Sequence, residues 1–200
     1  MGFRLAAIAT SDKFTKDTID SFAIRFFCNK LKFEKKVSFE EAMNLNYDEE
    51  YLDILFLDSG TFILGSSIDT LDRLNVKKNS FRNRAADFAI DEDSMTFIVN
   101  YYENLETKIE LFQHDEKQQV KRSDDFNISF SDGFDLSTTL IQNITGQSFY
   151  SFQQDLKLYR YKFTNDTPIF NEDDELWLTI YTMKTNDQAT MNKLVPANKT

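Results

Sequence analysis

The sequence predicts an α+β fold in which two or three helices pack on a mainly antiparallel sheet. Short apolar runs separated by turns of about four residues predict strands, and such turns connect antiparallel neighbours. Helical segments are too few to alternate with every strand, which argues against a doubly wound parallel sheet. With roughly 150 residues per domain as a guide, we expect one domain over residues 1–184 and a loosely ordered tail over 185–200.

The N-terminal part is expected to begin with a buried strand over residues 3–9. A helix capped by Thr15 would follow and extend to about Leu31, because apolar residues such as Ile19 and Phe22 repeat with helical spacing. A helix with so wide an apolar face is expected to lie against the sheet.

The next elements are a short helix and a hairpin. Ser38-Phe39-Glu40-Glu41 is a capping box that predicts a helix over about 39–45. Two apolar runs around Asp58-Ser59-Gly60 give the clearest hairpin signal in the chain, with strands at Leu52–Leu57 and Thr61–Leu64. A short amphipathic helix is expected over Ile68–Leu74.

The middle of the chain predicts an antiparallel meander of three strands, at Ala86–Ile90, Met95–Tyr102 and Thr107–Gln113. Residues 114–125 are almost wholly polar, so we expect a surface loop there. Residues 126–130 alternate apolar and polar side chains, which is the pattern of a half-buried strand.

The C-terminal part is expected to contain one more helix and two strands. Ser137 would cap a helix over about 138–145, which would end at Gly146 in a left-handed conformation. The two strands are expected at Leu156–Phe163 and Leu176–Met183, on either side of the acidic turn Asn165–Glu175.

Composition and charge narrow the function classes. The net charge of -10 argues against general nucleic-acid binding, which needs clustered basic residues. No apolar run approaches 18 residues, and the apolar run after Arg4 is too short for a secretory signal, so we expect a soluble protein with no membrane contact. The single cysteine, Cys28, has apolar neighbours and fits a reducing, cytoplasmic compartment.

Residue types argue against the common catalytic and cofactor sites. His114 is the only histidine and lies in a polar stretch, so it favours a surface position over a Ser or Cys catalytic pair. One histidine and one cysteine cannot supply a zinc site. Gly60 and Gly65 have the spacing of a phosphate loop but lack its Lys-Ser/Thr ending. We therefore expect no cofactor and no metal.

Carboxylates are the remaining candidates for acid and base chemistry. The clusters Asp91-Glu92-Asp93, Asp124-Asp125 and Glu172-Asp173-Asp174-Glu175 fall at expected turns, which favours solvated charges over metal ligands. Asp53, Asp58 and Asp87 lie in or beside apolar strands, where burial would raise a carboxyl pKa. Strand alternation favours the simpler prediction that Asp53 and Asp87 point outward into solvent.

Two groups of residues are candidate contact sites. Lys77, Lys78, Arg82 and Arg84 form the only basic concentration in the chain and could hold an anion or an acidic patch of a partner, although a solvated loop is favoured. Tyr159, Tyr161 and Phe163 share one strand face and could form an aromatic surface, although core packing is favoured.

These observations favour a non-catalytic intracellular protein-interaction module with another protein as its partner. Its acidity and size are like those of bacterial toxin-immunity and adaptor proteins, in general character only. The alternative is a small-molecule-binding protein or an enzyme that uses carboxylates and tyrosine, with a site between the sheet and a helix. A subunit of a homo-oligomer is a third hypothesis.

Overall fold

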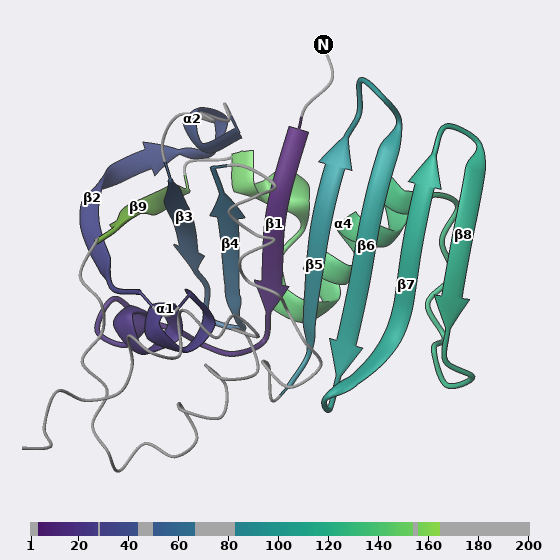
Figure 1. Ribbon diagram of the computed structural model, residues 1–200, viewed down its shortest axis with the longest axis horizontal. Coiled ribbons are helices and arrows are strands. Elements are labelled where there is room, and N and C mark those ends of the chain that lie inside the picture. The colour runs from purple at the N-terminus through teal and green to yellow at the C-terminus, as the bar shows by residue number, and fades with distance from the viewer. Residues whose placement is uncertain (1–3, 28, 44–49, 67–82, 154–155, 165–200) are drawn as a thin grey trace, which may run out of the picture.

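The computed structural model describes residues 4–27, 29–43, 50–66, 83–153 and 156–164. In this part of the chain, nine strands form one open sheet in the order β2-β9-β3-β4-β1-β5-β6-β7-β8, and each neighbouring pair is antiparallel (Figure 1). The strands are β1 (Arg4–Thr10), β2 (Leu31–Ser38), β3 (Tyr51–Phe56), β4 (Thr61–Gly65), β5 (Ala85–Asp91), β6 (Thr96–Glu103), β7 (Glu106–His114), β8 (Lys117–Arg122) and β9 (Lys157–Phe163).

The helices are α1 (Ile19–Phe27), α2 (Phe39–Met43), α4 (Gly133–Thr145) and the 3-10 helix η1 (Phe149–Gln153). The mainly antiparallel sheet expected from the sequence is confirmed. The protein is nevertheless richer in strands than a sheet with two or three packed helices suggests, since three α-helices accompany nine strands in the described residues.

The sheet has a core on each face. The larger core lies on the face covered by α2, α4 and η1, where Leu136, Leu140 and Ile144 of α4 pack against the central strands. The smaller core lies on the opposite face, where Ile19 and Phe22 of α1 are buried with side chains of β1, β3 and β4. Helix α4 lies behind the central strands and α1 in front of the β3 and β4 end of the sheet (Figure 1).

Several predicted elements are confirmed. β1, the hairpin β3–β4, the meander β5–β6–β7 and β9 occur where the apolar patterns place them. Helix α4 ends at Gly146, whose φ of 75° is in the left-handed region and whose N–H donates to the Gln142 carbonyl. At α2, the Ser38 hydroxyl accepts from the Glu41 N–H at 3.1 Å, as a capping box requires.

The predicted first helix is wrong in its bounds. It covers only Ile19–Phe27, and Leu31, expected at its end, begins strand β2. Five consecutive residues of β2 are exposed, so the strand lacks the apolar alternation by which a strand is recognised. The start of α4 was also misplaced, because Asp132 caps the helix and Ser137, buried inside it, donates to the Gly133 carbonyl at 2.7 Å.

The prediction for residues 114–130 is wrong in two ways. The expected loop contains strand β8, which is exposed along its whole length and so carries no apolar signal. The expected strand over 126–130 has the predicted alternation of burial but is not paired in the sheet. Its apolar side chains alternate in burial because they pack on the core on the α4 face of the sheet.

Other expectations lie outside the described residues: the helix over Ile68–Leu74, the Cys28 environment, the turn Asn165–Glu175, the strand Leu176–Met183 and the tail over 185–200. Among the helices that the structure does describe, none combines the length and apolar character that crossing a membrane would need.

Candidate interaction surface at the β8 edge

Strand β8 lies at one end of the sheet, with β7 as its only neighbour among the described strands (Figure 1). All six of its side chains are exposed. An end strand presents backbone N–H and C=O groups on its outer side, which another extended chain can pair with. The outer edge of β8 is therefore a surface on which a tenth strand could form.

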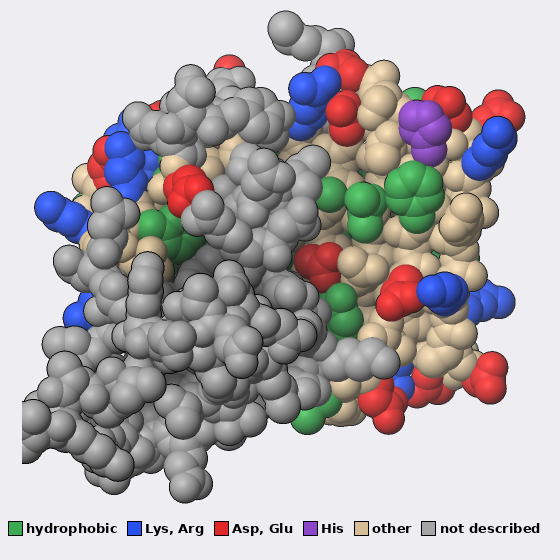
Figure 2. Space-filling model, in the orientation of Figure 1, with side chains coloured by type: hydrophobic (Ala, Val, Ile, Leu, Met, Phe, Trp, Pro, Cys, Tyr) green, Lys and Arg blue, Asp and Glu red, His purple; other side chains and the backbone are tan. Residues whose placement is uncertain are grey.

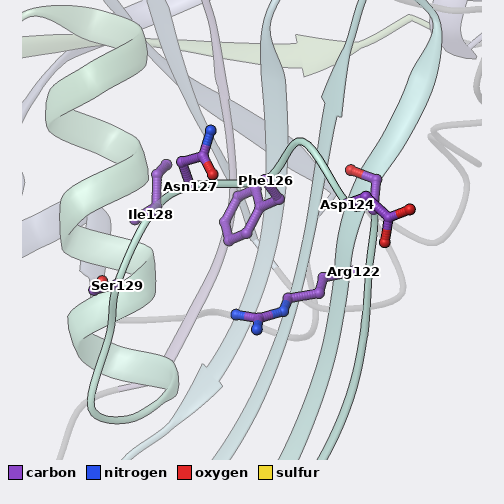
Figure 3. A pocket seen from close by; sticks show the side chains of 7 residues that line it. Arg122, Asp124, Phe126, Asn127, Ile128 and Ser129 are labelled. Atoms are coloured by element: carbon purple, nitrogen blue, oxygen red, sulfur yellow. The ribbon is translucent and has the colours of Figure 1, made fainter.

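The segment Phe126–Phe130 follows β8 without forming a strand and packs on the α4 side of the sheet (Figure 3). The Phe126 N–H donates to the Ser123 carbonyl at 3.1 Å, which closes the turn after β8. From Asn127 to Phe130, no hydrogen bond to any described residue is formed. This segment therefore lies beside the sheet without pairing to a described strand, and we call it the wall.

A groove lies between the end of β8 and this wall. It encloses about 490 Å³ and is lined by Arg122, Ser123, Asp124, Phe126, Asn127, Ile128 and Ser129. The Arg122 side chain extends toward the Phe126 ring, whereas Asp124 points away from it (Figure 3). The groove is thus lined by one cation, Arg122, whose side chain lies beside the buried Phe126.

A second hollow of about 930 Å³ lies at the other end of β8, lined by Met95, Gln113, His114, Asp115, Glu116, Lys117, Gln118, Ser131 and Asp132. Side chains two residues apart on a strand share a face, so Val120 lies between the two hollows, on the face of Gln118 and Arg122. Val120 is 40% exposed. We call the two hollows and Val120 together the β8 groove.

Gln113, on β7, holds the second hollow in shape. Its Oε1 accepts from the Gly133 N–H at 2.7 Å and from Gln118 Nε2 at 3.1 Å, and its Nε2 donates to the Asp115 carbonyl at 2.9 Å. Gln113 is buried. These bonds connect β7, β8 and the first residue of α4, so the second hollow is preformed in the protein by itself.

The charges of β8 are all positive: Lys117, Lys121 and Arg122. Lys121 Nζ lies 3.4 Å from Glu110 Oε2, and both side chains are well exposed. Lys117 and Arg122 make no ion pair with any residue that the structure describes. The three charged residues of β8 are thus all basic, so the expectation that Lys77–Arg84 is the only basic concentration of this acidic chain is wrong.

The sheet face opposite α4 is only partly apolar over β5 to β7. Ile98 and Phe112, opposite each other on β6 and β7, are 38% and 45% exposed, and Figure 2 shows hydrophobic side chains scattered among polar ones on this face. Asn100 Nδ2 donates to Asp87 Oδ2 at 2.7 Å. Burial, together with the charge and hydrogen bond of Asp87, raises the pKa of the neighbouring Tyr102 phenol.

The expectation that Asp53 points into solvent is wrong. Asp53 is fully buried on the α2 side of the sheet, where Arg160 donates to both of its carboxylate oxygens at 2.8 and 2.7 Å. The sequence cannot show this pairing, because the two residues are 107 positions apart. Asp87 is half-buried and hydrogen-bonded to Asn100, and Asp58 is exposed in the β3–β4 turn.

The basic candidates lie mostly outside the described residues. This applies to Lys77, Lys78 and Arg82, and only Arg84 is described. Arg84 is exposed just before β5, and its backbone carbonyl accepts from the Ser11 N–H at 2.9 Å.

The aromatic candidates pack largely into the smaller core. Tyr161 is buried, and Tyr159 and Phe163 are half-buried against the residues that α1 covers. Lys16 Nζ lies 4.2 Å from the centre of the Tyr159 ring and Lys36 Nζ 5.4 Å from it. A hydrogen bond with Lys16 lowers the pKa of the Tyr159 phenol.

The remaining polar candidates have ordinary surface partners. His114 Nδ1 lies 2.9 Å from Thr96 Oγ1, and both residues are at the surface. Asp91 forms an ion pair with Arg4 at 3.1 Å, and Asp125 with Lys108 at 2.7 Å. In the described ranges, no three His, Cys, Asp or Glu side chains gather as metal ligands would. The cluster Glu172-Asp173-Asp174-Glu175 lies outside those ranges.

Sequence reasoning missed the β8 groove, although one signal was present. The polar pair Asp115-Glu116 is a two-residue turn between β7 and β8, and Asp115 has the positive φ of 52° that such turns need. A turn of this kind after a strand predicts that the chain returns as a second strand. Comparison of the chain with protein-family models, curated proteins and solved structures gave no match.

Proposed function

We propose that this chain is a non-catalytic protein-interaction module that binds an extended segment of another polypeptide along strand β8. The observation that carries the proposal is an end strand with all six side chains exposed, beside a preformed groove. The chain has a net charge of -10, and the three charged residues of β8 are positive, so this edge differs in charge from the protein as a whole.

Strand addition explains why an exposed edge and a groove occur together. In this mode of recognition, main-chain hydrogen bonds provide affinity and pockets for alternate side chains provide specificity. The outer edge of β8 offers the hydrogen bonds. The groove between β8 and the segment 126–130, on the α4 side, offers space for side chains on one face of the added strand. The second hollow lies at the β7–β8 turn and is lined by residues of both faces.

The carboxylate-dependent alternative is less well supported by the geometry. Asp53 is the most deeply buried of the candidate acids, but Arg160 occupies both of its oxygens. Burial raises the pKa of Asp53, and the hydrogen bonds from Arg160 oppose that shift. Because Asp53 is fully buried and the guanidinium donates to both of its oxygens, this pairing favours a structural role for Asp53.

A displayed library of random peptides, selected on the immobilised full-length chain, tests the proposal. Selected peptides are expected to lose binding to Val120→Asp, which places a charge in the groove. They are expected to keep binding to Phe33→Asp, a matched change at a 49% exposed apolar residue of the opposite end strand, β2. Failure to enrich any peptide, or equal binding to both variants, would contradict the proposal.

A further inference from the structure

Resting on the proposed function, the geometry points to the chemistry of the partner: we infer that the segment bound at β8 is extended and alternates acidic with aliphatic side chains. The inference depends on how the six side chains of β8 divide between the two faces of the sheet. Lys117, Gln119 and Lys121 share the open face, and Gln118, Val120 and Arg122 share the face of the groove.

On the open face, the two lysines of β8 favour carboxylates on the added strand. On an added strand, side chains directly opposite those of β8 would lie about 4.5–5.5 Å away, measured between Cβ atoms. A glutamate opposite Lys117 or Lys121 therefore reaches the ammonium group. Lys117 has no ion pair with a described residue, and Lys121 has only the 3.4 Å contact with Glu110. Both cations can accept a carboxylate without breaking a buried pair.

On the groove face, Val120 favours an aliphatic side chain opposite it. Val120 is 40% exposed, and the half-buried Ile128 lies on the wall, whereas Phe126 is buried in the core. An aliphatic side chain above Val120 would cover apolar surface that now faces water.

A second copy of this chain fits the edge poorly. If β8 paired with its own copy in antiparallel orientation about residue 119, Lys117 would face Lys121 twice. Pairing about the point between residues 119 and 120 would place Lys117 opposite Arg122. Like charges directly opposite each other destabilise a sheet. Each copy also carries a net charge of -10, so the charges favour a different polypeptide.

Lysines on an end strand can also serve only to prevent edge-to-edge aggregation. The two roles make different predictions. A protective edge has no preferred ligand, and neutralising its lysines should produce self-association. A recognition edge should bind the matching strand and lose affinity when the lysines are neutralised.

The test uses three labelled ten-residue peptides, in which valine alternates with glutamate, with threonine or with lysine. Fluorescence anisotropy with the full-length chain measures their affinity at low and high salt. The glutamate peptide is expected to bind most tightly and to weaken with salt. Lys117→Gln with Lys121→Gln should lower its affinity by up to about fivefold per lost pair. The control pair Lys32→Gln and Lys157→Gln, on β2 and β9, should leave it unchanged.

The possible failures are distinguishable. Equal binding of all three peptides would overturn the acidic partner while leaving strand addition at β8 in place. Binding of none of them, while library peptides still depend on Val120, would also overturn the acidic partner alone. Binding of none, together with self-association of the glutamine variant, would identify a protective edge and overturn both proposals.

Discussion

Arg160 of β9 holds the carboxylate of Asp53 of β3 through two hydrogen bonds, at 2.8 Å from Nε and 2.7 Å from Nη2. The Arg160 guanidinium also lies 3.9 Å from the centre of the Tyr51 ring, and its Nη1 lies 3.8 Å from Glu41 Oε1. The pair connects strands that are far apart in sequence but adjacent in the sheet. It therefore helps to fix β9 between β2 and β3.

Breaking this pair should be costly, because one charge would stay buried without its partner. Arg160→Met is expected to lower the free energy of unfolding by about 3–5 kcal/mol. The double variant Asp53→Leu, Arg160→Met should recover much of that loss, since no buried charge remains. Urea denaturation measures both, with Lys121→Met as a surface control that should cost less than about 1 kcal/mol. If Arg160→Met lowered the free energy of unfolding as little as Lys121→Met, the structural role of the Asp53–Arg160 pair would be contradicted.

Gly133, the first residue of α4, should not tolerate a side chain. A Cβ atom placed there would overlap Phe97 Cβ and lie 2.8 Å from Phe97 Cγ. Gly133→Ala is therefore expected to destabilise the protein by about 1–3 kcal/mol, although alanine favours helices. Asn143→Ala, at an exposed position of the same helix, should stay within about 0.5 kcal/mol of the parent. Thermal unfolding distinguishes the two, and equal midpoints would show that α4 can move away from β6.

Alkaline pH should destabilise the fold through two adjacent tyrosines. Burial raises the pKa of Tyr101 to about 12 and raises that of Tyr102 as well. Because the unfolded phenols ionise near pH 10, their contribution to stability is present below that pH and is lost as pH rises through the folded values. Absorbance at 295 nm should show tyrosines that titrate only on unfolding. Tyr102→Phe should make stability less dependent on pH above about pH 10, and an unchanged profile would contradict this assignment.

Acidic pH should destabilise the protein by protonating surface carboxylates, and not by protonating Asp53. A hydrogen bond from Lys108 lowers the pKa of Asp125, so its contribution to stability is present above the unfolded pKa of about 4 and is lost as pH falls through the lower, folded value. Burial raises the pKa of Asp53, so protonation of Asp53 changes stability in the opposite direction as pH falls. Asp125→Asn is expected to flatten the acid limb of a stability profile measured between about pH 5 and pH 2. If the acid limb of Asp125→Asn were as steep as that of the parent, the loss of stability in acid would not come from Asp125.

The inner part of the fold could be predicted because its side chains carry the signal. The hairpin β3–β4 and the meander β5–β6–β7 bury apolar residues, and short polar turns separate them. Gly146 marked the end of α4 because a left-handed residue is needed there. Burial and turn chemistry are local properties, so a single sequence shows them.

The ends of the sheet could not be predicted for the same reason. β2 and β8 are exposed over most or all of their length, so neither shows the alternation of a half-buried strand. Residues 126–130 do alternate but are unpaired, since alternation reports burial on one face and not hydrogen bonding to a neighbour. The candidate site lies between β8 and residues 126–130, both of which were misassigned, and the only sequence signal for it was the turn Asp115-Glu116.

Amide hydrogen exchange of the full-length chain, with and without the alternating glutamate and valine peptide, tests the account most directly. Added backbone hydrogen bonds should slow exchange within β8, at residues 117–122, while exposed β2 exchanges at an unchanged rate. A peptide that binds without slowing any amide of β8, or that protects β2 instead, would contradict strand addition at this edge.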